Sequence, residues 1–140
     1  MIWFDLATGD LSRRGVVRTV LPGSAPLTAI AEADIRRIAG AVLAIRFDKF
    51  SDGRGFTTAR HLREALAFTG RLVAQGHIIP DQADYLRRCG FTHVEINRRA
   101  AGQWRLSLAL APPAMQRVLE SPRARSPTSN RPATPPEGLN

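Results

Sequence analysis

The stretch Phe50-Ser51-Asp52-Gly53-Arg54-Gly55-Phe56 joins an apolar run to an amphipathic one. The run before it, residues 41–47, is almost continuously apolar, which is typical of a buried strand. The run after it, residues 57–68, has its apolar side chains at helical spacing. A strand that enters a helix through a turn with two glycines opens a βα unit, and such units pack into α/β layers. The stretch therefore predicts an α/β domain.

The same periodicity predicts further elements along the chain. Residues 27–38 and 81–89 have the apolar spacing of amphipathic helices. Residues 72–75 and 93–96 have the composition of short strands. Residues 104–110 fit two interpretations, because their strict alternation favours a strand while apolar side chains four residues apart also allow a helix.

Glycines mark the ends of the three predicted helices. Gly40 ends the first helix, Gly70 is the predicted C-cap of the second, and Gly90 is predicted to cap the third in the left-handed conformation. Pro80 suits the first turn of the third helix, because that position needs no backbone N–H.

The two ends of the chain are less regular. Residues 1–26 are punctuated by glycine and proline and predict an irregular N-terminal arm or hairpin, in which residues 15–21 could form one short strand. Residues 112–140 are rich in proline and predict a tail that is disordered from about residue 121. The α/β domain is accordingly predicted over residues 27–111.

These elements predict a small three-layer or partial (βα)n domain with a short, mostly parallel sheet. The three internal strands are few for a closed domain. Either the first and last segments add strands to the sheet, or the chain forms a homodimer that completes its layers.

Composition limits the classes of partner. The chain has 140 residues and a formal net charge of +8, with Lys49 as its single lysine among 20 basic residues. These arginines are spread over helices, loops and tail instead of forming a stripe, so binding to nucleic acid is not expected. The single cysteine, Cys89, cannot form an internal disulfide, and we expect neither a secretory signal nor a membrane span. The sequence therefore predicts a cytoplasmic protein.

The turn Asp52-Gly53-Arg54-Gly55 is the strongest candidate for a binding site. Its glycines allow a sharp turn, and the helix behind it presents free N–H groups, to which Arg54 adds a guanidinium. Such a turn suits sulfite, sulfate or a cofactor phosphate. The alternative is that Asp52 pairs with Arg54 or caps the helix, and that the glycines only shape the turn. Arg60 and Arg63 either extend the anion site or are solvated.

A secondary candidate group follows the second predicted strand and consists of His77, Asp81 and Gln82. A histidine and an aspartate one helical turn apart could share a proton. Asp81 also has a structural explanation at the start of its helix. Cys89 is predicted to be a core residue, and the histidines lack the close spacing of a zinc site, so no metal is expected.

Residues 50–91 carry a series of short motifs in a fixed order. The residues concerned are Phe50, Asp52-Gly53-Arg54-Gly55-Phe56, Ala59, Leu62-Arg63, Phe68-Thr69-Gly70, Ala74, Gly76, Asp81-Gln82 and Arg87-Arg88-Cys89-Gly90-Phe91. In these motifs the chain resembles a bacterial family of unknown function that is associated with sulfite reduction (domain of unknown function 934). Val73 and His77 depart from the pattern, because the family tends to have Arg and Asp at these positions.

The resemblance implies a cytoplasmic accessory of assimilatory sulfite and sulfate reduction. Such a protein would dock onto sulfite reductase or its electron donor, or bind an oxyanion, without a redox centre of its own. One alternative is a small oxidoreductase that uses a flavin or a phosphate-bearing ligand and is completed by dimerisation. A second alternative is an arginine-rich module that binds nucleic acid. The family's usual label is oxidoreductase, but no catalytic constellation or cofactor motif is visible, so the sequence leaves open whether the chain is an enzyme.

Overall fold

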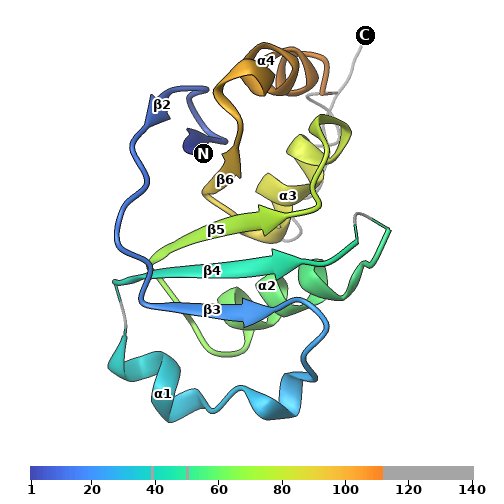
Figure 1. Ribbon diagram of the computed structural model, residues 1–140. Coiled ribbons are helices and arrows are strands. Elements are labelled where there is room, and N and C mark those ends of the chain that lie inside the picture. The colour runs from blue at the N-terminus through green and yellow to red at the C-terminus, as the bar shows by residue number, and fades with distance from the viewer. Residues whose placement is uncertain (39, 50, 112–140) are drawn as a thin grey trace, which may run out of the picture. The chain divides into compact units, whose positions relative to one another are not determined.

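The computed structural model describes residues 1–38, 40–49 and 51–111, which form a mixed α/β domain (Figure 1). Its strands are β1 (Ile2–Asp5), β2 (Leu11–Ser12), β3 (Thr19–Pro22), β4 (Val42–Phe47), β5 (Arg71–Gly76) and β6 (His93–Ile96). Its α-helices are α1 (Glu32–Arg37), α2 (Arg54–Glu64), α3 (Ala83–Cys89) and α4 (Ala101–Ala109), and its 3-10 turns are η1 (Leu27–Ala29), η2 (Pro80–Gln82) and η3 (Arg98–Ala100). The predicted α/β class is confirmed.

The strands form one sheet in the order β2-β1-β6-β5-β4-β3. The four strands from β3 to β6 are parallel and adjacent in chain order, while β1 runs antiparallel to β6 and β2 antiparallel to β1. Because each βα unit advances the sheet by one strand in the same direction, right-handed connections place α1, α2 and α3 on one face. In Figure 1 the strands lie in front of α2 and α3. We call the covered side the helix face.

The main core lies on the helix face. Leu43, Ile45 and Phe47 alternate along β4 and point to this side, where Phe56 and Leu62 of α2 meet them. The intervening residues of the strands point the other way and form a smaller cluster with an N-terminal tryptophan: Trp3, Val42, Ala44 and Val73. Both faces of the sheet therefore carry an apolar cluster, but the cluster on the second face is small and leaves other positions of that face, such as Arg46 and Arg71, exposed.

Residues 13–18 cover the smaller cluster, and we call them the strap. Val17 packs against the cluster, and Gly15 lies so near the Trp3 ring that a Cβ atom there would be 3.1 Å from it. The strap connects β2 to β3 and crosses the beginnings of the parallel strands (Figure 1). The face that it crosses is called the strap face below.

The N-terminal segment differs from the expected irregular arm. Residues 1–26 contain a hairpin, which was one of the two predicted alternatives. Its strand β1, however, is an integral part of the sheet beside β6. Trp3 and Phe4 are buried on opposite faces of β1, because Phe4 packs near Trp104 in the helix-face core and Trp3 lies under the strap. The segment also supplies β3, so the first segment adds three strands to the sheet.

The helix boundaries differ from the predicted ones around α2. The helix begins at Arg54 and ends at Glu64, instead of covering residues 57–68. The chain reverses through Ala67, which has a left-handed φ of 55°, so that Phe68 reaches the core and its N–H donates to the Leu62 carbonyl at 2.8 Å. Gly70 is therefore not the predicted cap. It is a point of close approach, because a Cβ atom there would collide with the Ala41 carbonyl oxygen.

The other boundaries agree more closely with the sequence. The predicted helix 27–38 is divided into η1 and α1, and Gly40 and Gly90 have the positive φ values of 81° and 112° that suit residues beyond a helix end. Residues 104–110 lie mostly in helix α4, from which Trp104 reaches the core, so the helical interpretation of this segment is confirmed. The predicted Pro-rich tail, residues 112–140, lies outside the described residues. No helix within those residues has the length and apolar character that a membrane crossing requires.

Candidate functional site

The turn after β4 holds Arg54 in contact with Asp52. The Asp52 Oδ1 atom accepts hydrogen bonds from the Arg54 backbone N–H at 3.1 Å and from Nε at 3.0 Å, and Oδ2 accepts one from Nη2 at 2.7 Å. Gly55 is needed for packing, because a Cβ atom there would press into the Phe47 ring, whereas Gly53 faces open space. An anion at this turn would have to share Arg54 with the Asp52 carboxylate.

This contact changes the titration of both groups. The hydrogen bonds from Arg54 lower the pKa of Asp52 from 3.8 to about 2, and Asp52 raises the pKa of Arg54. Water reaches the pair, since 64% of the Arg54 side chain and 22% of the Asp52 side chain are exposed. Both groups are therefore charged at neutral pH, and their charges largely cancel within the turn.

Arg63 is bound by the main chain of two neighbouring segments. Its Nη1 donates to the Phe68 and Gly70 carbonyls at 2.9 and 2.8 Å, and its Nε and Nη2 donate to the Gly90 carbonyl at 3.0 and 2.7 Å. The guanidinium also lies 5.4 Å from the centre of the Phe68 ring. Burial lowers the pKa of Arg63. The residue fastens the chain after α2 to the end of α3.

Arg60 contacts α3 in a different way and does not join Arg54 either. Its Nε lies 3.4 Å from the Cys89 sulfur, and its guanidinium lies 5.9 Å from the centre of the Tyr85 ring. Since a helix rises about 1.5 Å per residue, Arg63 lies roughly 14 Å from Arg54 along α2. The structure therefore does not gather the three arginines of the sequence hypothesis around one point. Cys89 is buried, as predicted.

The loop after β5 lies beside the end of β4. The His77 backbone N–H donates to the Phe47 carbonyl at 2.8 Å, while its side chain is exposed. The Gln82 side chain accepts a hydrogen bond from the Ile79 N–H at 3.1 Å and so supports the start of η2. Asp81 is exposed, and among the described residues no hydrogen bond or ion pair joins it to His77. The structure thus gives this group a helix-starting role without a His–Asp contact.

The strap face carries a polar cluster around Glu95. Its Oε1 atom accepts hydrogen bonds from the Trp3 indole N–H at 3.0 Å and from the Gln75 amide at 3.3 Å, and it forms an ion pair with the Arg14 Nε at 3.2 Å. Only 12% of the Glu95 side chain is exposed. This carboxylate ties the strap to β1, β5 and β6, and it fixes the position of Arg14.

His93 lies next to this cluster on the same face. Its ring centre is 5.9 Å from that of Trp3, and its Nδ1 is 2.8 Å from the Thr92 hydroxyl oxygen. Burial lowers the pKa of His93, and the carboxylate of Asp5, 3.8 Å from Nε2, opposes that shift. This cluster is not among the sites predicted from the sequence, although the alternation of polar and apolar residues in 93–96 places His93 and Glu95 on one face.

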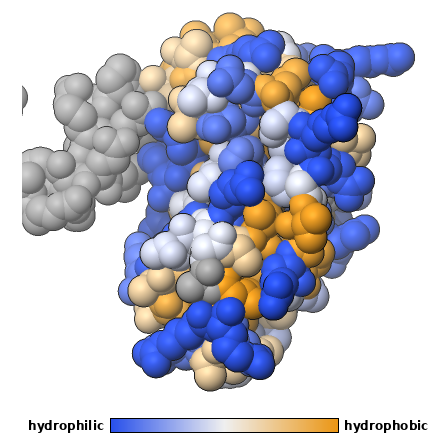
Figure 2. Space-filling view, turned by 90° about the vertical axis from the view of Figure 1, so that its left-hand side faces the viewer, coloured by the Kyte–Doolittle hydropathy of each residue, from blue (hydrophilic) through white to orange (hydrophobic). Residues whose placement is uncertain are grey.

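Several arginines on or beside the strap face form no ion pair with the residues that the structure describes. Arg46 and Arg71 occupy strap-face positions of β4 and β5, and Arg13 and Arg98 lie near the start of β1. Within residues 1–38, 40–49 and 51–111, none of these four side chains has an ion-pair partner. Figure 2 shows hydrophilic residues along its right-hand side, which is the strap face, mixed with a hydrophobic patch.

A hollow of about 410 Å³ lies among some of these arginines. It is lined by Met1, Ile2, Arg13, Arg14, Asn97 and Arg98. It lies where β6 ends and β1 begins, since Ile2 and Ile96 are partners in the sheet. Ligands of parallel α/β sheets commonly bind beyond the carboxyl ends of the strands, as this hollow does with respect to β6. The guanidinium groups of Arg13 and Arg98, with Arg14 paired to Glu95 beside them, make it suitable for a small oxyanion.

Comparison with protein families identifies the group to which the chain is related. The family model described as "Bacterial protein of unknown function (DUF934)" matches residues 21–123, well over half of the chain. The chain belongs to this family. No curated protein and no solved structure matches it. The matched range begins in β3, so β1, β2 and the strap precede it.

The structure gives physical roles to several residues of the family's motifs. The Asp52–Gly55 turn starts α2 and packs against Phe47, and Arg63 and Gly90 form the connection between α2 and α3. Val73 is fully buried on the strap face between Ala44 and His93, whereas His77 is exposed at the start of the loop after β5. The two departures from the family pattern therefore lie in different surroundings.

Proposed function

We propose that the chain is an accessory protein of sulfite and sulfate reduction that recognises an anionic partner through its strap face. The association with sulfite reduction rests on the resemblance to the family, and the cytoplasm is the compartment in which such a protein would act. The recognition step rests on the distribution of charge. In this proposal the protein docks onto an acidic surface of sulfite reductase or of its electron donor, without a redox centre of its own.

The observation that carries the proposal is the contrast between engaged and unengaged arginines. Those on the helices are held by the fold: Arg36 by Glu32, Arg37 by Asp34, Arg54 by Asp52, Arg63 by carbonyls, Arg87 and Arg88 by Asp84, and Arg105 by the Gly9 carbonyl. Arg46 and Arg71 have no such partner among the described residues. Exposed, uncompensated charges of one sign steer an oppositely charged partner and orient it on contact.

The hollow beside Arg13 and Arg98 adds a place for a small anion or a partner carboxylate. Arg14 is held in position by Glu95, so it loses little freedom when an anion arrives. The Asp52–Gly55 turn remains a second anion candidate, but without the extension by Arg60 and Arg63, because these two side chains are directed to Cys89 and to the Gly90 carbonyl. It is the weaker one, because Asp52 already occupies the Arg54 guanidinium.

Two matched double variants test the proposal. Arg46→Ala/Arg71→Ala removes two positive charges from the strap face, and Arg36→Ala/Arg37→Ala removes the same charge from α1. We expect the first to weaken binding to purified sulfite reductase or to a ferredoxin-type donor by roughly tenfold, because it removes the steering charges. The second should bind as the wild type does, and binding should weaken with salt.

Inorganic sulfite and sulfate should be titrated as well, and their binding is monitored by the NMR signals of the arginine side chains. Shifts at Arg13 and Arg98 would assign the oxyanion to the hollow, and shifts at Arg54 would assign it to the turn. Absence of binding to the reductase, the donor and both oxyanions would contradict the proposal. Tighter binding to single-stranded DNA than to any of these, at physiological salt, would favour the nucleic-acid alternative instead.

A further inference from the structure

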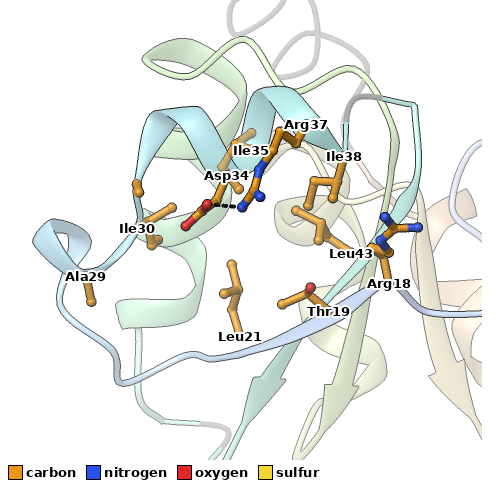
Figure 3. Close-up of a pocket in the computed structure, with 11 residues that line it drawn as sticks. Arg18, Thr19, Leu21, Ala29, Ile30, Asp34, Ile35, Arg37, Ile38 and Leu43 are labelled. Atoms are coloured by element: carbon orange, nitrogen blue, oxygen red, sulfur yellow. Dashed lines mark hydrogen bonds and ion pairs between the residues drawn. The ribbon is translucent and has the colours of Figure 1, made fainter.

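A second hollow lies on the helix face, at the edge of the sheet. It measures about 400 Å³ and lies between β3, α1 and the chain that connects η1 to α1. Figure 3 shows side chains from both sides pointing into it. Its walls are Arg18, Thr19, Leu21, Ala29, Ile30, Ala31, Asp34, Ile35, Arg37, Ile38 and Leu43. Its location on the other face of the sheet separates it from the surface proposed above.

The sequence explains why this part of the core is not filled. Elsewhere on the helix face, aromatic residues such as Phe56, Phe68 and Trp104 fill the space between helices and strands. Around the hollow the apolar walls are made only of alanine, leucine and isoleucine. The covering helix α1 has only six residues, and β3 is the last strand of the sheet. A short helix and small side chains thus leave space at an open edge.

The hollow has the size and lining of a small-molecule site. Ligand sites commonly measure about 300–1,000 Å³ and combine apolar walls with a few polar groups. Ile35 and Leu43 form a buried apolar floor here, while Leu21, Ile30 and Ile38 are partly buried. An apolar ligand body would remove these side chains from water, which favours binding by about 25 cal/mol for each Å² covered.

The polar groups of the hollow indicate the charge of the ligand. Arg37 is paired with Asp34, as the dashed line in Figure 3 marks, so this pair adds no net charge. Arg18 lies at the other end, where the strap meets β3, and has no ion-pair partner in the described part of the chain. Thr19 also lines the hollow and adds a hydroxyl group to its wall. The net charge of the wall is therefore positive at one end only.

We propose that this hollow binds a small amphipathic carboxylate, with its aliphatic or aromatic body against the isoleucines and its carboxylate at Arg18. The ligand class follows from one uncompensated guanidinium at the end of an apolar space. A fully polar ligand would leave the apolar walls uncovered, and the second charge of a dianion would lie near the Asp34–Arg37 pair, which offers no net positive charge. An uncharged hydrocarbon would leave Arg18 without a counter-charge.

The test uses the full chain and dodecanoate as the probe, measured by its displacement of 1-anilinonaphthalene-8-sulfonate. Thr19→Phe adds bulk that points into the hollow, and Val20→Phe adds the same ring on the opposite face of β3, where Val20 is 46% exposed. We expect Thr19→Phe to weaken dodecanoate binding at least about tenfold, because the ring takes up ligand volume. Val20→Phe should leave binding unchanged.

A second pair of variants tests the carboxylate. Arg18→Ala should weaken dodecanoate about fivefold or more but leave dodecanol unaffected, since only the charged head contacts Arg18. Arg36→Ala, which removes an arginine of α1 outside the hollow, is the matched control. Thermal melting of each variant shows whether its fold is kept, and competition between free dodecanoate and lipid vesicles distinguishes a free acid from a membrane lipid as the source of the head group.

Three results would overturn this proposal. The first is absence of dodecanoate binding to the wild type, and the second is equal binding by Thr19→Phe and Val20→Phe. The third is a wild-type dimer that Thr19→Phe converts to a monomer, since a second copy of the chain would then cover the hollow.

Discussion

The two faces of the sheet use the same residue type in opposite ways. On the helix face, Arg63 is enclosed by the carbonyls of Phe68, Gly70 and Gly90. On the strap face, Arg46 and Arg71 project from neighbouring strands, and the described residues supply no ion-pair partner for either. The net charge of +8 is thus unequally available to a partner. The arginines that stabilise the fold differ from those that can recognise another molecule.

The apolar cores of the two faces also differ, both in size and in what covers them. The helix-face core connects strands with four helices, whereas the strap-face cluster has four buried residues and is covered by one extended segment. A segment without regular structure can move away at a smaller cost than a packed helix can. We therefore expect changes on the helix face to affect stability, and changes on the strap face to affect recognition.

The largest expected effect is that of Arg63→Met compared with Arg46→Met. Methionine keeps the apolar stem of Arg63 but leaves three carbonyl groups without their donors, which should lower the free energy of unfolding by about 2–4 kcal/mol. Arg46→Met should change it by less than about 0.5 kcal/mol, as exposed positions usually do. Urea unfolding of both variants measures the difference. Equal losses would mean that the two faces do not differ in this way.

Two glycines provide a smaller contrast of the same kind. Gly55 touches the Phe47 ring in the helix-face core, and Gly15 touches Trp3 under the strap. Gly55→Ala should cost about 1–3 kcal/mol, because a packed ring has to shift. Gly15→Ala should cost less than about 1 kcal/mol, because the strap can lift instead. Gly53→Ala, which faces open space, serves as the control in the same turn. If thermal unfolding shows a larger loss of stability for Gly15→Ala than for Gly55→Ala, the strap does not lift as expected.

The sequence was sufficient for the elements whose signals are local. Strands β4, β5 and β6 follow from short apolar runs, and the end of α3 follows from Gly90. Strand β1 was missed because it is buried on both faces and pairs with a strand about 90 residues away, so no local alternation marks it. The end of α2 was misplaced because the reversal occurs at Ala67, which carries no turn signal.

The roles of the arginines were still harder to predict. Arg60 and Arg63 look alike in the sequence, but Arg63 is held by carbonyls that lie 5, 7 and 27 residues further along the chain. The strap-face arginines can be recognised as neighbours only when the strand order is known, together with the fact that the helices cover one face of the sheet. Spacing within one helix contains neither piece of information. The structure instead supports the interpretation of the Asp52–Gly55 turn as a pair that shapes the start of α2.

A third prediction concerns pH and the strap face. Burial lowers the pKa of His93 from 6.5, and Arg71 acts in the same direction, while Asp5 acts against it. A histidine whose pKa is lower in the folded than in the unfolded state binds protons preferentially when unfolded. Its contribution to stability is therefore complete above pH 6.5 and is lost as the pH falls below that value.

Unfolding in urea at a series of pH values across this range measures the effect. We expect a modest decrease in the free energy of unfolding on acidification, and His93→Gln should flatten it. His77→Gln, which alters an exposed histidine, should leave the pH dependence as it is in the wild type. A wild-type curve without any decrease would show that the strap leaves His93 in contact with water.

The smallest expected effect lies in the turn after β4. The hydrogen bonds from Arg54 hold the pKa of Asp52 at about 2, so the carboxyl carbon shift of Asp52 should stay that of a carboxylate down to about pH 3. Arg54→Met removes these donors and should return the pKa towards 3.8. Because the pair is exposed, the variant should melt close to the wild-type temperature. An unchanged pKa in Arg54→Met would show that the pair does not form in solution. Arg54 would then be as available to an anion as Arg46 is, and the turn would regain its place as the leading anion site.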